Sequence, residues 1–191
     1  IESEKKFLTV FFSDIVSFTS ISDKMDSAPL TEMLNLYLTK MSEIALKYGG
    51  TIDKYIGDSV MIFFGDPETL GKDQDALNCV KMAIEMQSTV KKLSNSFMND
   101  FSLLNPLKIR VGIHSGECTV GNFGSEKRLD YTVIVGTVNL ASRLESNSPE
   151  GKILISEKTK SLIVNKINCE KYDEINVKGF NENINTFIPI F

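Results

Sequence analysis

The residues TIDKYIGDSVMIFF, numbers 51–64, place two short apolar runs on either side of Gly57-Asp58. Both runs are rich in β-branched and aromatic residues, and a glycine-aspartate pair between such runs is typical of a tight turn. The stretch therefore predicts a β-hairpin with strands over Thr51–Ile56 and Ser59–Phe64. A hairpin joins antiparallel strands, so the sheet that contains it should be at least partly antiparallel.

Extended and helical patterns alternate around this hairpin. Lys6 to Ser13 (KFLTVFFS) predicts a buried strand, and Thr31 to Tyr48 and Ala76 to Leu93 have the apolar spacing of helices. The polar residues 95–106 indicate a loop. Downstream, the patterns predict strands at 107–113 and 131–135, a helix at 138–145, a strand at 152–155, a helix at 157–164, and strands at 172–177 and 185–189.

This order of elements predicts an α+β domain. Strands and helices alternate, but hairpins are interleaved, which favours a sheet with helices on one face over a doubly wound parallel fold. The 191 residues suit a single domain, 1–191. Because the chain begins with Ile1 rather than Met, we expect it to be excised from a longer protein.

Composition narrows the class of partner. Apolar residues make up 42% of the chain and the net charge is −4, so the sequence predicts a packed globular domain that does not bind nucleic acid. A small molecule that carries phosphate remains compatible with this charge. Cys79, Cys118 and Cys169 form no CxxC pair, which indicates free thiols in a reducing compartment.

The sequence also bears on location. No run approaches the roughly 20 apolar residues that cross a bilayer, and no signal peptide is present. We therefore expect a cytoplasmic segment without membrane contact of its own, which is compatible with the cytosolic part of a membrane or sensor protein.

Two carboxylates stand where strands end. Asp14 follows the first apolar strand, and Asp58 occupies the hairpin turn. Two carboxylates on adjacent strands can hold two divalent ions for phosphoryl transfer. Taken alone, Asp14 could instead cap a helix and Asp58 could simply form the turn. The segment from Ile15 to Ser20 offers backbone N–H groups to a phosphate but lacks the glycines of a Walker loop.

Five blocks together resemble the catalytic domain of class III adenylyl and guanylyl cyclases. They occur in the family's order and cover nearly the whole chain: FSDIVSFTSIS (12–22), DKYIGDSVMIFFG (53–65), RVGIHSGECTVGNFG (110–124), DYTVIVGTVNLASRLE (130–145) and VKGF (177–180). The resemblance implies a ferredoxin-like (βαββαβ-type) fold with a mainly antiparallel sheet and flanking helices. It also implies conversion of ATP to 3′,5′-cyclic AMP and pyrophosphate with two Mg²⁺ or Mn²⁺ ions.

The resemblance assigns roles to individual residues. Asp14 and Asp58 match the metal-binding aspartates, and the backbone carbonyl of Ile15 would bind one of the metals. Asn139 would orient the ribose, and Arg143 would offset charge that develops on the α-phosphate. The residues that match phosphate-binding positions are Phe18, Thr19, Arg110 and Lys178.

Selection of the base depends on two positions. Lys54 matches a lysine of adenylyl cyclases, where guanylyl cyclases usually carry glutamate, and a cationic donor suits the acceptor N1 of adenine. Thr132 matches a threonine of the bacterial and soluble adenylyl cyclase subgroup, and its hydroxyl can accept a hydrogen bond from the N6 amine.

The chain departs from the subgroup in the segment Ile134-Val135-Gly136, where glycine comes one place late. Alignment on Asn139 gives Thr132 to the base, whereas alignment on Gly136 gives it Val133. We favour the first alignment because Asp130-Tyr131-Thr132 then matches without a gap.

Family members build the site between two cyclase domains, and this chain carries both sets of residues. The resemblance therefore implies a head-to-tail homodimer with ATP in two equivalent sites. The alternatives are a guanylyl or relaxed-specificity cyclase, a cyclase-like domain that binds without turnover, and a polymerase-palm-like domain.

Overall fold

The computed structural model describes residues 3–134, 136–176 and 183–191. The strands are β1 (Glu4–Ile15), β2 (Thr51–Ile56), β3 (Ser59–Phe64), β4 (Ile109–Ser125), β5 (Arg128–Ile134), β6 (Ile153–Ser156), β7 (Cys169–Lys171) and β8 (Thr186–Pro189). The helices are α1 (Phe18–Lys24), α2 (Ser27–Lys47), α3 (Lys72–Phe101), α4 (Gly136–Asn147) and α5 (Glu157–Leu162).

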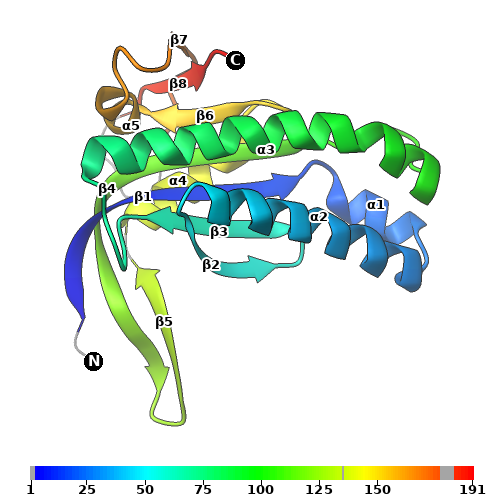
Figure 1. Ribbon diagram of the computed structural model, residues 1–191, viewed down its shortest axis with the longest axis horizontal. Coiled ribbons are helices and arrows are strands. Elements are labelled where there is room, and N and C mark those ends of the chain that lie inside the picture. Colours follow the sequence, from blue (N-terminus) through cyan, green and yellow to red (C-terminus); the bar gives the residue numbers. More distant parts are fainter. Residues whose placement is uncertain (1–2, 135, 177–182) are drawn as a thin grey trace.

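The described strands form one sheet in the order β2-β3-β1-β4-β6-β8-β7, and β5 pairs with β4 beside this path (Figure 1). The pairs are antiparallel except for β4 with β6, which is parallel. The predicted α+β fold with a mainly antiparallel sheet and flanking helices is therefore confirmed.

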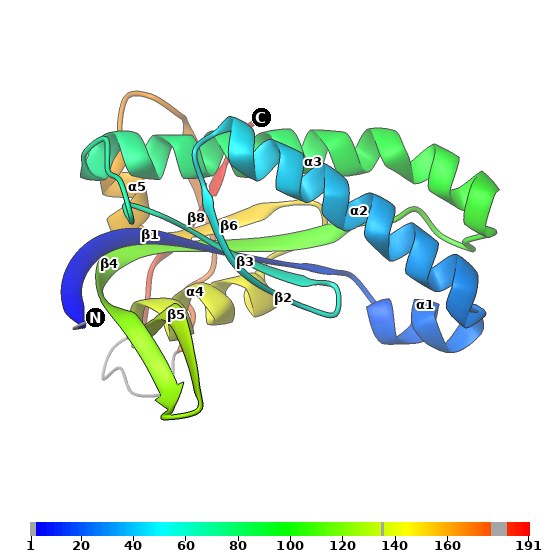
Figure 2. The ribbon, with the colours of Figure 1, turned by 60° about the horizontal axis from the view of Figure 1, so that its bottom comes forward.

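Helices cover both faces of this sheet, so the expectation of helices on one face was wrong. Helices α2 and α3 pack on one face, while α4 lies on the other (Figure 2). A large core contains buried residues of α2 and α3, among them Tyr37 and Met86, against sheet residues such as Phe11. A separate cluster joins Ala141 of α4 to Leu8 and Val10 of β1. Alternate residues of β1 thus serve different helices.

Helix α4 lies unusually close to β4 because a glycine faces it. A Cβ atom at Gly112 would come within 2.1 Å of the Glu145 backbone nitrogen and 2.6 Å of the Ala141 carbonyl oxygen. A larger residue at this position would push the helix off the sheet. The pairing of Gly112 with α4 therefore fixes where the residues of this helix lie.

Several elements differ in extent from their predictions. The loop expected at 95–106 is helical up to Phe101, since α3 keeps its buried stripe through Ser94 and Phe97. The strand predicted at 107–113 continues as β4 to Ser125, paired first with β1 and then with β5. Residues 172–174 form no strand, and Ile175 makes only an isolated bridge. The predicted ends Val135 and Val177 lie outside the described residues.

The structure bears on two predictions, that of free thiols and that of a segment without membrane contact. All three cysteines are free, and Cys79 and Cys118 are buried. Among the described residues, none of the helices combines the length and apolar character that a membrane crossing requires.

Candidate active site

The two predicted metal-binding aspartates come together where β1 meets the β2–β3 hairpin. β3 pairs antiparallel with β1, with Val60 opposite Ser13, so the hairpin turn lies beside the end of β1. Gly57 supplies the positive φ of 58° that this two-residue turn requires. The Ile15 backbone N–H donates a hydrogen bond of 2.7 Å to Oδ2 of Asp58. The sheet thus holds Asp58 against the residue that follows Asp14.

The electrostatics of this pair fit a cation. Oδ1 of Asp14 is buried and has no hydrogen-bond partner among the described residues. Burial raises the pKa of Asp58, and the negative charge of Asp14 adds to that effect, while the N–H of Ile15 opposes it. Carboxylate oxygens that lie close together and repel each other are typical ligands of hard divalent cations. The residues present therefore fit a divalent metal.

A third carboxyl, which the sequence patterns did not reveal, belongs to this cluster. Glu145 of α4 is only 8% exposed, and its Oε1 has no hydrogen-bond partner among the described residues. Burial, followed by contact with Asp14, raises the pKa of Glu145 to about 9, and Arg110 opposes the shift. The available signal was its phase, because Glu145 falls on the buried stripe that contains Ala141 and Leu144.

The predicted phosphate-binding Arg110 lies beside the carboxylates. The register of β1 and β4 pairs Arg110 with Asp14. Nε of Arg110 donates to the Ser148 carbonyl at 3.1 Å, and its guanidinium lies 3.5 Å from Glu150. The Arg110 side chain is about one-third exposed, so its guanidinium lies at the edge of the carboxyl cluster and is accessible to a ligand.

Phe18 and Thr19 begin α1, a few residues beyond Asp14. The preceding Ser17 has a left-handed conformation with φ of 56°, which turns the chain sharply from β1 into the helix. Phe18 packs partly buried against the large core, whereas Thr19 is exposed. The structure thus places the predicted phosphate turn directly after the paired aspartates.

Asn139 and Arg143 project from the opposite side of α4. Both are exposed, one helical turn apart, while Glu145 and the apolar residues of the same helix face the sheet. Asp14 continues the alternation of Val10 and Phe12 on the sheet face that α4 covers. The structure therefore brings Asn139 and Arg143 together but points them away from the metal-binding pair of the same chain.

The predicted base-binding positions lie on two strands. Lys54 is exposed on β2, with its Nζ 3.4 Å from a carboxylate oxygen of Asp53. Thr132 lies on β5 opposite Gly121 of β4, and the structure describes its backbone. Lys178, the second predicted phosphate-binding cation, lies outside the described residues.

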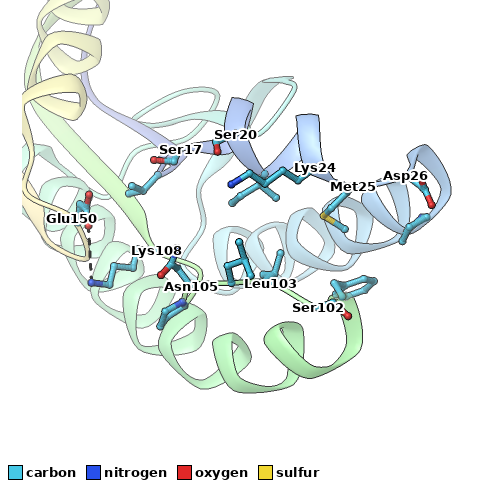
Figure 3. Close-up of a pocket in the computed structure, with 16 residues that line it drawn as sticks. Ser17, Ser20, Lys24, Met25, Asp26, Ser102, Leu103, Asn105, Lys108 and Glu150 are labelled. Atoms are coloured by element: carbon cyan, nitrogen blue, oxygen red, sulfur yellow. Dashed lines mark ion pairs between the residues drawn. The ribbon is translucent and has the colours of Figure 1, made fainter.

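A pocket of about 520 Å³ lies elsewhere, between α1, the start of α2 and the loop that follows α3 (Figure 3). Lys24, Leu103 and Asn105 are among its lining residues, and Lys108 pairs with Glu150 at its edge. Of the predicted site residues that the structure describes, none lines this pocket.

Residues 2–189 match a family described as the adenylate and guanylate cyclase catalytic domain. The chain belongs to this family. The crystal structure of the adenylyl cyclase CyaB from P. aeruginosa superposes on this cyclase domain with a TM-score of 0.97 and 50% identity, over 100% of this chain and 97% of that one. The guanylyl cyclase Cya2 gives a TM-score of 0.91 and 32% identity, over 99% and 94% of the chains.

One curated relative is much longer than this chain. The terminal-differentiation specific adenylate cyclase of Dictyostelium discoideum is 36% identical over 187 residues, which is 95% of this chain and 8% of that protein. The cyclase domain described here thus spans less than a tenth of the length of this relative.

Proposed function

We propose that this domain is an adenylyl cyclase that converts ATP into 3′,5′-cyclic AMP and pyrophosphate at the interface of a homodimer. The observation that carries the proposal is the meeting of Asp14 and Asp58 at the end of β1, where a buried carboxylate oxygen lacks a donor. Similarity to CyaB and to the Dictyostelium adenylate cyclase supports the choice of reaction.

Asp14, Asp58 and the backbone carbonyl of Ile15 would hold two divalent cations, Mg²⁺ or Mn²⁺. When bound, such ions favour ionisation of the attacking hydroxyl and offset charge on the triphosphate. The 3′ hydroxyl would give its proton to solvent water, and its oxygen would bond to the α-phosphorus as the bond from that phosphorus to the bridging oxygen breaks, so that pyrophosphate leaves with the electron pair. No side chain of the described cluster is a suitable general base, since Glu145 holds its own proton beside Asp14.

The remaining predicted residues would bind the nucleotide and orient it. Phe18 and Thr19 would offer backbone N–H groups to the phosphates, and Arg110 and Lys178 would offer cations. Asn139 would orient the ribose. Arg143 would stabilise the charge that develops on the α-phosphate, an interaction that is strongest in the transition state.

Lys54 and Thr132 support ATP over GTP. A lysine ammonium only donates hydrogen bonds, so it matches the unprotonated N1 of adenine and not the N1–H of guanine. A threonine hydroxyl accepts from the exocyclic amine of adenine. A base that leaves these groups unpaired loses about 1–3 kcal/mol of binding, or roughly a 5- to 150-fold preference.

The exposed position of Asn139 and Arg143 supports a homodimer. These residues point away from the aspartates of their own chain and are available to the site of a second copy. Two residues that follow Lys54 on β2 are also exposed, Tyr55 by 40% and Ile56 by 67%.

The experiment incubates the purified domain with ATP or GTP and with Mg²⁺ or Mn²⁺ at several protein concentrations, and measures cyclic nucleotide and pyrophosphate. We expect cyclic AMP from ATP, equimolar with pyrophosphate, at a rate that rises more steeply than linearly with protein concentration until the dimer is saturated. Cyclic GMP as the main product would assign the domain to guanylyl cyclases. Absence of both products in a folded dimer would contradict the enzymatic proposal.

A further inference from the structure

Asp66 is a buried residue just beyond β3, and each of its carboxylate oxygens accepts a hydrogen bond. The residue is 2% exposed. Nζ of Lys6 donates to Oδ1 and pairs with its charge, and the hydroxyl of Tyr131 donates to Oδ2 at 2.6 Å. The Asp66 backbone carbonyl accepts from the Thr51 hydroxyl at 2.7 Å. One residue thus binds β1, β2 and β5 at once.

Two of these three strands carry the proposed base-binding residues. Thr51 precedes Lys54 by three residues on β2, and Tyr131 directly precedes Thr132 on β5. Among the described strands β5 pairs with β4 alone, and β2 lies at the edge of the sheet beyond β3. Within the sheet, β3, β1 and β4 therefore lie between β2 and β5. Asp66 connects β2 to β5 directly, because it makes hydrogen bonds with both strands.

We propose that Asp66 and Tyr131 are positioning residues that set the spacing between Lys54 and Thr132, and thereby the preference for adenine over guanine. This inference rests on the proposed function, because it presumes that the two residues bind the base. A sheet twists and flexes across several ladders, so a direct tie between its distant strands restricts their separation. Hydrogen bonds to an ionised carboxylate are short and strong, which makes Asp66 a suitable anchor. Discrimination between purines requires donors and acceptors held to within a fraction of an ångström.

The position of Tyr131 suits it to transmit this restraint. Its ring is 47% exposed, so the hydroxyl rather than the packing of the ring joins β5 to the interior. Removal of the hydroxyl would remove the tie to Asp66 and leave β5 held near Thr132 by its pairing with β4, with the core intact. The contacts of Asp66 with Lys6 and Thr51 would remain, so β1 and β2 would stay joined.

The test compares kcat and KM for ATP and GTP in the wild-type domain and in Tyr131→Phe. We expect the ratio of kcat/KM for ATP to that for GTP to fall roughly tenfold, mainly through a higher KM for ATP, with an unchanged dependence on Mn²⁺ concentration. Tyr48→Phe is the matched control, because Tyr48 lies at the end of α2 beside Lys81 and Ile84 of α3, outside the proposed site. This control should keep the wild-type ratio.

A second variant keeps the proposal testable if Tyr131→Phe is poorly folded. Asp66→Asn retains the shape of the side chain and an acceptor for one donor, so its ATP/GTP ratio should fall below the wild-type value by less than tenfold, and an unchanged ratio would also overturn the inference. An unchanged ratio in a folded Tyr131→Phe, with an active wild type, would overturn this inference alone. Absence of cyclic product from the wild type would overturn the proposed function and this inference with it.

Discussion

The two sides of α4 differ sharply in their environment. On the side that faces the sheet, Glu145 is buried against Asp14, and Oδ1 of Asp14 and Oε1 of Glu145 have no hydrogen-bond partner among the described residues. On the other side, Asn139 and Arg143 are exposed. Gly112 allows the helix to lie close to β4, which fixes the position of both sides relative to the sheet.

This difference explains how one chain can carry a complete set of catalytic residues without forming a complete active site by itself. One side presents carboxyl groups that fit divalent cations, and the other presents an exposed guanidinium that fits a phosphate. Head-to-tail association would bring the exposed side of one copy to the buried side of the next, and two such contacts close a symmetric dimer. If the comparison is correct, the two sides should respond differently to substitution.

The largest effect should come from the buried side. Asp58→Asn removes a metal-binding charge, and we expect the cyclase rate in Mg²⁺ to fall by about 10³-fold or more. The asparagine oxygen can still accept from the N–H of Ile15, so the fold should survive. Asp26→Asn, at an exposed aspartate, is the control and should keep the activity. If Asp58→Asn retained more than a tenth of the wild-type rate, the metal-binding role of the buried side would be contradicted.

A somewhat smaller loss should follow substitution on the exposed side. Arg143→Ala should lower kcat by about 10²- to 10³-fold, because it removes a charge that acts in the transition state. It should change the free energy of unfolding by no more than about 0.5 kcal/mol, since the side chain is exposed. Lys91→Ala removes an exposed cation from α3 and should leave both quantities unchanged. A large loss of stability in Arg143→Ala would show that this side is structural.

A further effect concerns the dependence of stability on pH and leaves the cyclase rate aside. Between its ordinary pKa of 4.5 and its raised pKa of about 9, Glu145 keeps its proton in the folded state, whereas the unfolded chain has released it. The metal-free domain should therefore lose stability as pH rises through this window, by at most about 1.4 kcal/mol per pH unit. Asp58 contributes in the same direction, because burial also raises its pKa.

The buried His114 acts in the opposite direction at lower pH. Burial lowers its pKa to about 4, so it adds stability as pH rises toward 6.5. The measurement should therefore compare urea midpoints at pH 7 and pH 9 in the presence of EDTA. Glu145→Gln should flatten the decline seen in the wild type. Equal slopes in the two proteins would contradict the assignment of the proton to Glu145.

The sequence predicted local structure best where turn chemistry marked it. The hairpin of β2 and β3 has the predicted bounds, because Gly57 provides the positive φ that the turn demands. The extension of β4 was missed, since Gly116, Gly121 and Gly124 suggest a loop and only pairing with β1 and β5 makes the segment extended. Such pairing is tertiary information, which no local pattern contains.

The residues of the candidate site likewise include some that the sequence predicted and some that it missed. Asp14 and Asp58 were predicted from strand ends and a resemblance, and the structure brings them together. Glu145 and Asp66 were missed, because one resembles a solvated helical acid and the other a turn former until their burial is known. The roles of Asn139, Arg143, Lys54 and Thr132 stay predictions, since they concern a ligand and a second chain.

Mixing two inactive variants tests most directly whether the two sides of α4 serve different sites. Asp58→Asn damages the buried side only, and Arg143→Ala damages the exposed side only. In an equimolar mixture that has re-equilibrated, about half of the dimers contain one copy of each, and one of their two sites has no substitution. We predict recovery of about one quarter of the wild-type specific activity. A mixture no more active than the average of its two components would contradict the shared-site account.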